Sequence, residues 1–124
     1  LPKFKKIKNM VFDFTISKQN NYAVISLEGN LIEKGQALQL IEQAGALTNE
    51  GCNKWAIDLE KLIYMNSSGL NTLIQLLTKA RVAGGEAVLF NMNKKINELI
   101  LITKLHTLFK VADSKQSALT MLEV

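Results

Sequence analysis

The sequence is poor in the residues that most often carry enzymatic chemistry. Its 124 residues contain one cysteine, Cys52, and one histidine, His106, which leaves neither an internal disulfide nor a metal site built from several such ligands. Apolar residues make up 48%, enough for a core, but no apolar run approaches the roughly 20 residues that a membrane-spanning helix needs. We therefore expect no membrane insertion, and the lone cysteine is compatible with a cytoplasmic location.

Sequence motifs of the common enzyme classes are also missing. The chain has no GxSxG, no Walker-type loop and no GxGxxG, so hydrolase, NTPase and dinucleotide-binding functions lack their usual support. A nucleophilic pair of Cys52 and His106 is conceivable, but a loop thiol and a partly buried imidazole are the simpler interpretation. The prediction is a protein that is not an enzyme, with no catalytic residue, no metal and no cofactor.

Positive charge is concentrated at the start of the sequence. Four of the 15 basic residues lie in residues 1–10, so beyond them the basic residues equal the 11 acidic ones in number. Arg81 is the only arginine, whereas phosphate-binding surfaces usually gather several arginines and lysines. We therefore predict no nucleic-acid binding, and we divide the chain into a basic lead-in, residues 1–10, and one domain, residues 11–124.

Hydrophobic periodicity and turn residues predict alternating strands and helices. The helix at 68–83 is the clearest, and Gly84 and Gly85 follow it as a left-handed C-terminal cap requires. Asn93 is placed to cap the next helix, and Asp113 or Ser114 the last one. The expected elements are strands at 11–17 and 22–28, a helix at 34–48, a strand at 54–59, a loop at 60–66, a helix at 68–83, a strand at 86–91, a helix after 93, a short strand at 108–112 and a helix after 114.

This order of elements predicts an α/β fold. The first two strands form an antiparallel hairpin, and the later strands are joined by crossover helices and are therefore parallel. If successive strands are neighbours, the right-handed crossovers place the connecting helices on the same face. The expected architecture is an open, mostly parallel sheet with an antiparallel first strand and helices mainly on one face.

The segment before the clearest helix is the main candidate site. Asn66, Ser67, Ser68 and Gly69 follow a strand and open that helix, and the carboxyl ends of parallel strands are where α/β sheets build their sites. A helix N-terminus offers free N–H groups and the positive end of the dipole, so it tolerates an anion or a phosphorylated serine. A simpler interpretation is that Asn66 or Ser67 merely caps the helix.

The same region carries a resemblance to a known family. The stretch IDLEKLIYMNSSGLNTLIQLLTKARVAGGEAVLFNM is similar to the core of the STAS domain of bacterial anti-sigma factor antagonists, whose pattern is a strand, a short loop, Asp-Ser-Ser/Thr-Gly-Leu, an amphipathic helix, Gly-Gly and a strand. The likeness continues through ITKLHTLFKVADSKQSALTML, and VISLEGNL resembles the family's opening. The resemblance covers roughly residues 11–122 and implies the STAS-like fold, in agreement with the expected element order.

The resemblance also implies a regulatory cycle. In STAS antagonists the serine after the motif's Asp is phosphorylated by an anti-sigma factor, a serine kinase of the histidine-kinase-like ATPase class, and a phosphatase resets the cycle. The unmodified antagonist binds the anti-sigma factor and frees the sigma factor. The matching serine here is Ser67, with Ser68 as the alternative, and Asp58 is a structural residue near the site. The implied partner-binding residues are Asn66, Ser67, Ser68, Gly69, Leu70, Asn71 and Ile74, of which Leu70, Asn71 and Ile74 are expected on the exposed side of the helix.

Two positions depart from the family pattern. Asn66 stands where the family has Asp, and Lys104 stands where the family usually has Gly in a turn. The neutral Asn66 favours a second hypothesis, a STAS interaction or scaffold module of a signalling or lipid-transport complex that is not phosphorylated. A third hypothesis is a binder of a small anionic ligand at the same helix N-terminus.

Overall fold

Five strands form one sheet, and strands that are consecutive along the chain are neighbours in it. The computed structural model describes residues 11–124. The sheet order is β1-β2-β3-β4-β5, in which β1 is antiparallel to β2 and the other pairs are parallel, so the predicted open, mostly parallel sheet is confirmed. The strands are β1 (Phe12–Lys18), β2 (Ala23–Leu31), β3 (Lys54–Met65), β4 (Glu86–Phe90) and β5 (Lys110–Ala112).

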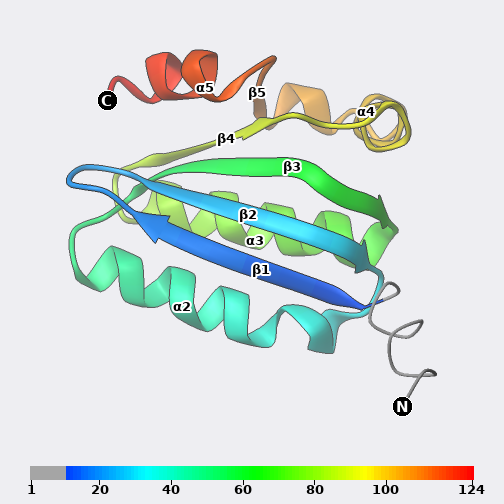
Figure 1. Cartoon of the computed structure of the whole chain (residues 1–124), viewed down its shortest axis with the longest axis horizontal. Coiled ribbons are helices and arrows are strands. Elements are labelled where there is room, and N and C mark those ends of the chain that lie inside the picture. Colours follow the sequence, from blue (N-terminus) through cyan, green and yellow to red (C-terminus); the bar gives the residue numbers. More distant parts are fainter. Residues whose placement is uncertain (1–10) are drawn as a thin grey trace.

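Three helices connect the parallel strands and pack on one face of the sheet, as predicted, while the last helix lies on the other face (Figure 1). The three connecting helices are α2 (Leu38–Asn49), α3 (Ser67–Val82) and α4 (Lys94–Ile102), and the last helix is α5 (Lys115–Leu122). A 3₁₀ helix, η1 (Lys34–Ala37), precedes α2. A 3₁₀ helix η2 (Leu105–Thr107) leads into β5. Within residues 11–124, no helix has the length and apolar character needed to cross a membrane. The predicted lead-in, residues 1–10, lies outside the described residues.

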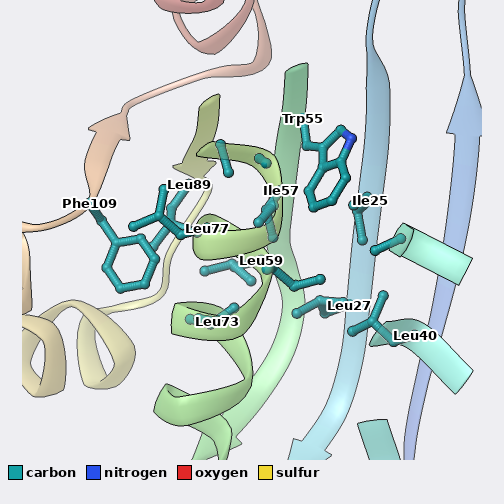
Figure 2. Packing of buried hydrophobic residues seen from close by; sticks show 14 of the residues in the cluster. Ile25, Leu27, Leu40, Trp55, Ile57, Leu59, Leu73, Leu77, Leu89 and Phe109 are labelled. Carbon is teal, nitrogen blue, oxygen red and sulfur yellow. The ribbon is translucent and has the colours of Figure 1, made fainter. Parts of the chain in front are cut away.

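The main core lies between the sheet and its three covering helices. Alternate residues of β3, namely Trp55, Ile57 and Leu59, point to this face and are fully buried (Figure 2). Leu73 and Leu77 of α3 pack against them from the helix side. The indole N–H of Trp55 donates to the Cys52 carbonyl oxygen at 3.0 Å, so this large ring is buried without an unsatisfied polar atom. The core therefore fixes α3 against the centre of the sheet.

The second and third strands are longer than the sequence indicated. Gly29 does not end β2, which continues to Leu31, and residues 60–66 are not a loop, because β3 continues to Met65. The two extensions pair with each other across two register shifts. These irregularities break the alternation of buried and exposed residues along β3, since two neighbouring pairs, Glu60–Lys61 and Ile63–Tyr64, are both exposed. A pattern search with period two therefore misses the second half of the strand.

Residue Lys104 adopts the conformation that a glycine would favour. It follows α4 with φ +62° and ψ +18°, in the left-handed region, and its N–H donates to the Leu101 carbonyl oxygen at 3.0 Å. The left-handed conformation is thus adopted although a lysine, and not a glycine, occupies this turn. A side chain in this region is strained, because its Cβ lies close to the carbonyl oxygen that follows it.

Replacing Lys104 with glycine is therefore expected to stabilise the protein by about 1 kcal/mol. The matched control is Lys95→Gly inside α4, where the backbone is helical and the same change should destabilise by about 1 kcal/mol. Urea unfolding followed by circular dichroism measures both. Equal destabilisation by the two variants would show that the left-handed turn carries no strain.

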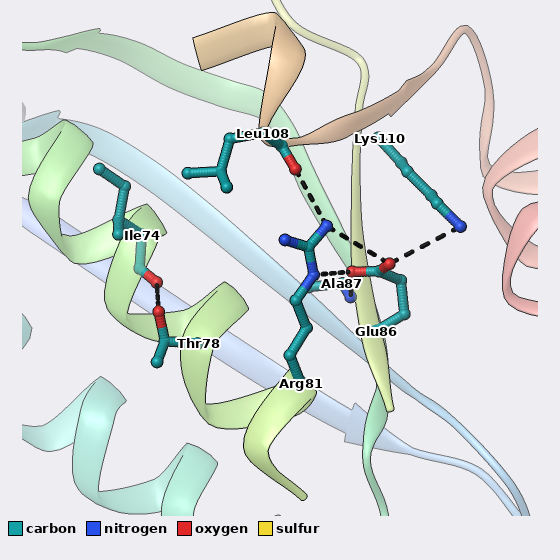
Figure 3. Close-up of polar contacts among 7 residues, drawn as sticks. All are labelled: Ile74, Thr78, Arg81, Glu86, Ala87, Leu108 and Lys110. Atoms are coloured by element: carbon teal, nitrogen blue, oxygen red, sulfur yellow. Dashed lines mark hydrogen bonds and ion pairs between the residues drawn. The ribbon is translucent and has the colours of Figure 1, made fainter. Parts of the chain in front are cut away.

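A cluster of polar contacts ties the end of α3 to the start of β4 and β5 (Figure 3). The guanidinium of Arg81 donates to Glu86 through Nε at 2.9 Å and to the Leu108 carbonyl oxygen through Nη2 at 3.0 Å. The Lys110 ammonium lies 3.6 Å from the other oxygen of the same carboxylate. Burial alone would raise the pKa of Glu86, but the hydrogen bonds from Arg81 and Ala87 and the charges of Arg81 and Lys110 lower it below its ordinary value of 4.5.

The stabilising contribution of Glu86 should depend on pH. Because its pKa is lowered on folding, the carboxylate contributes stability above its unfolded-state pKa, and this contribution is lost as the pH falls through its folded-state pKa. We expect Glu86→Gln to cost about 1 kcal/mol at pH 7 and close to nothing once the pH lies well below the folded-state pKa. Chemical unfolding of both proteins over this range measures the difference. A cost independent of pH would exclude the charged contact as its cause.

Candidate functional site

The candidate site lies where β3 ends and α3 begins, next to the end of β2. Asn66 caps α3: its side-chain oxygen accepts from the backbone N–H groups of Ser68 at 3.0 Å and Gly69 at 3.2 Å. Its side-chain nitrogen donates to the Ile32 carbonyl oxygen at 2.9 Å. The side-chain amide of Asn66 therefore provides acceptors for free N–H groups at the start of α3, and it also attaches this start to the segment after β2. Sequence reasoning missed Ile32, because its role depends on a contact across 34 residues.

Gly69 is required by a close approach of the backbone. It is buried, and a Cβ at this position would lie 2.5 Å from the Leu31 carbonyl oxygen and 2.6 Å from the Met65 Cβ. Such contacts are far inside van der Waals distance, so any side chain would push α3 away from β2. The glycine of the motif thus sets how closely the helix start sits against the sheet.

The two serines differ in exposure. Ser67 is the first residue of α3 and is exposed, whereas Ser68 is half-buried. The first turn of α3 contains no acidic residue, and the last turn contains Lys79 and Arg81. The dipole at the start of this helix is therefore not compensated by a carboxylate of its own first turn. Ser67 is thus an exposed residue beside the positive partial charge of a helix start, which is the environment that the sequence led us to expect.

The other predicted partner-binding residues do not all reach the surface. Asn71 is exposed and Ile74 is half-buried, but Leu70 is 6% exposed and belongs to the core cluster. The expectation that Leu70 lies on the exposed side of the helix is therefore wrong. The physical reason is the direction of α3: its first turn is held down onto β2 at Gly69, so the following residue also faces inward.

Asp58 lies in the middle of β3 rather than at its end, and it faces the side of the sheet opposite to the main core. Its Oδ1 accepts from the Glu60 backbone N–H at 3.0 Å and from the Asn91 side chain at 3.3 Å. The predicted strand at 54–59 is too short, because β3 runs on to Met65, seven residues beyond Asp58. Asp58 therefore has a structural role, because it links β3 to Asn91, the residue that follows β4.

Neither Cys52 nor His106 belongs to this site. Cys52 is buried just before β3, and burial raises the pKa of its thiol, which makes it a poor nucleophile. His106 lies in η2 and is exposed, not partly buried as expected. Among residues 11–124, no group of three or more His, Cys, Asp or Glu side chains could hold a metal ion.

Replacing Asn66, which caps α3, should lower the free energy of unfolding of the protein. Asn66→Ala leaves the N–H groups of Ser68 and Gly69 and the Ile32 carbonyl oxygen without their partner, so we expect a loss of about 1–2 kcal/mol. Asn66→Asp keeps the cap but cannot donate to Ile32, so its cost should be smaller. Urea unfolding measures both changes. A cost for Asn66→Asp equal to that of Asn66→Ala would mean that the cap contributes nothing.

The sequence matches a family model over most of its length. The model, described as STAS domain, covers residues 13–118. The chain belongs to the STAS domain family. The serine motif, the N-terminal cap and the sheet order described above are therefore features of a STAS domain.

Two curated relatives are similar to this STAS domain. A candidate anti-sigma factor antagonist, BtrV, of Bordetella bronchiseptica is 27% identical over 104 residues, which cover 84% of this chain and 89% of that protein. The anti-sigma F factor antagonist of Paenibacillus polymyxa is 25% identical over 101 residues, which cover 82% of this chain and 86% of that protein.

Solved structures share the fold. The protein TM1081 of Thermotoga maritima superimposes with a TM-score of 0.79 at 19% identity, covering 90% of this chain and 95% of that one. The Bacillus cell fate determinant SpoIIAA in its phosphorylated form gives a TM-score of 0.68 at 18% identity, covering 88% of this chain and 98% of that one. At these identities the likeness establishes the fold of the STAS domain and nothing finer.

Proposed function

We propose that this STAS domain is an anti-sigma factor antagonist that is switched off by phosphorylation of Ser67. Curated relatives over most of its length are named as antagonists or candidate antagonists. A solved structure with the same fold is that of a phosphorylated form of SpoIIAA. The observation that carries the proposal is the position of Ser67, exposed at the first residue of α3.

The proposed partner is an anti-sigma factor that is also a serine kinase of the histidine-kinase-like ATPase class. It would transfer the γ-phosphoryl group of ATP to Ser67 Oγ, with release of ADP and the hydroxyl proton. A phosphatase would hydrolyse the phosphoserine and restore the free serine. In this cycle the chain itself is a binding module and not an enzyme, needs no cofactor, and works in the cytoplasm.

Phosphorylation at this position would change charge much more than shape. A phosphate adds about −1.5 to −2 charges at neutral pH, and the free N–H groups and dipole of a helix start stabilise such an anion. Ser67 lies in solvent, so the added group displaces no core side chain. A partner surface that is neutral or acidic opposite Ser67 would lose binding energy by desolvation and repulsion. The switch therefore acts on affinity.

Equilibrium binding to the histidine-kinase-like anti-sigma factor encoded in the same genome tests this proposal. Isothermal titration with ADP present, which prevents phosphoryl transfer, should give a complex of micromolar affinity or tighter. Adding the unmodified chain to a complex of the anti-sigma factor with its sigma factor should release the sigma factor. No binding and no release would exclude an antagonist function.

A second candidate function is a STAS interaction module that is not phosphorylated. The neutral Asn66 favours it, because the position lacks the carboxylate that the family pattern places before the serine. Under this function Ser67→Asp would leave the set of co-purifying partners and their affinities unchanged. Under the first function the same variant would bind its partner about 30-fold more weakly.

A further inference from the structure

The face of the sheet that carries α5 is only partly covered. α5 packs over β4, β5 and the first half of β3, where it meets Ala56, Val88, Phe90 and Ala112. Within residues 11–124, no helix covers the same face of β1, β2 and the second half of β3, a surface called here the open face (Figure 1). Parallel strands such as β2 and β3 usually have both faces covered, so the open face is a place where a further segment can pack.

The open face is acidic. The residues that line its hollows include four carboxylates, those of Asp13, Glu28, Asp58 and Glu60, against one lysine, Lys61. None of these carboxylates forms an ion pair with another described residue. Asp13 lies directly opposite Glu28 in the β1–β2 pair, and like charges in this position destabilise a sheet. A cationic segment on this face would remove that repulsion.

Two shallow hollows on the open face join into one trough. The first, about 170 Å³ in volume, includes Ser26 and Asp58 in its lining, and the second, about 330 Å³, includes Val11. They are continuous because Glu28 and Lys61 line both. The trough therefore begins at Val11, the first described residue, and runs across β1, β2 and β3.

The residues that precede Val11 have the opposite charge. Residues 1–10 contain Lys3, Lys5, Lys6 and Lys8 and no acidic residue. Ten residues can reach about 33 Å, which is more than the roughly 23 Å that the seven residues of β1 span, so this segment is long enough to follow the trough. Since it is attached at the rim of the trough, its effective concentration there is about millimolar. A second copy of the chain at micromolar concentration cannot compete with it.

We propose that residues 1–10 bind the open face of their own chain as a basic strap, with lysines paired to the carboxylates of the trough. The strap covers the side of the sheet opposite α3, so it is independent of the proposed phosphorylation of Ser67. Exposed ion pairs are individually weak and are screened by salt. The strap should therefore be bound at low ionic strength and released as the salt concentration rises.

A double-mutant cycle in the full chain tests the strap, with the midpoint of urea unfolding as the readout. The comparison chain carries Lys3→Gln, Lys5→Gln, Lys6→Gln and Lys8→Gln. In the wild type, Glu28→Gln removes a partner of the strap and should lower the midpoint. In the comparison chain the same change only relieves the repulsion from Asp13 and should raise the midpoint. An equal shift in the two chains would overturn the proposal.

The matched control for this cycle is Glu42→Gln. It removes an exposed carboxylate from α2, which packs on the other face of the sheet. The control should shift the midpoint equally in the wild type and in the comparison chain. A Glu42→Gln effect that differs between the two chains as much as that of Glu28→Gln would mean that the lysines act through net charge, and it would overturn the strap.

Backbone amide chemical shifts locate the contact. Between the wild type and the comparison chain, the amide signals of Ser26, Glu28 and Asp58 should shift, and added NaCl should move the wild-type signals toward those of the comparison chain. Shifts confined to Val11 and Phe12, which adjoin the strap in the sequence, would overturn the proposal. Wild-type signals that change on dilution would assign the contact to a second copy and would overturn binding within one chain.

Discussion

Phosphorylation of Ser67 is expected to weaken binding of the anti-sigma factor a few hundred-fold, which corresponds to about 3–4 kcal/mol. The phosphate places close to two negative charges against the partner surface opposite Ser67, which we propose to be neutral or acidic. Ser67 is exposed and its helix start stabilises anions, so the midpoint of thermal unfolding should stay the same or rise slightly. Titration of the anti-sigma factor with the phosphorylated and unmodified chains measures the change in Kd.

A charge variant gives the same test without the kinase. Ser67→Asp adds one charge instead of nearly two, so we expect a weakening of about 30-fold. The matched control is Ser117→Asp, which adds the same charge to the first turn of another helix, α5, on the opposite face of the sheet. Ser117→Asp should bind like the wild type. Equal effects of the two variants would assign the weakening to net charge and not to the site.

Replacing Gly69 with alanine is expected to cost about 2–3 kcal/mol of folding stability, the largest loss that a single methyl group is expected to cause at this site. The added Cβ would meet the backbone of Leu31 and the Cβ of Met65, and neither can rotate away. The start of α3 must then move from the sheet, which also displaces Ser67. Binding of the anti-sigma factor should fall by more than stability alone explains.

The matched control is Gly45→Ala in the middle of α2. A Cβ there meets only the flexible end of Lys79 at 3.6 Å, so the change should stabilise the protein by about 0.5–1 kcal/mol through the better helix propensity of alanine. Urea unfolding of the two variants gives effects of opposite sign. A Gly69→Ala variant as stable as the wild type would mean that the glycine is not needed for close packing.

Local chemistry made much of this fold predictable. Asn93 and Ser114 cap α4 and α5 as predicted, because each side chain accepts from an N–H group only three residues away. The parallel pairing followed from the alternation of strands and helices, and, once successive strands are taken as neighbours, the fixed hand of crossovers placed the connecting helices on one face. In the same way the sequence suggested the candidate site, since a cap and two serines in front of a strongly amphipathic helix are all local signals.

Features set by contacts between distant segments were not predictable. The length of β3 depends on pairing with β2 across register shifts, which erase the period of two on which the prediction relied. The burial of Leu70 depends on how closely Gly69 approaches β2. None of these leaves a signal within a short window of sequence.

The central claim is that the Ser67 hydroxyl, at the start of α3, is the acceptor of the phosphoryl group. The most direct test incubates the chain with the anti-sigma factor of its own genome and ATP, then maps the phosphate by mass spectrometry of peptides. The account predicts one phosphate on Ser67, none on the half-buried Ser68, and none on a Ser67→Ala variant. A phosphate on Ser68 in both proteins, or no phosphate on a wild-type chain that forms the complex, would contradict it.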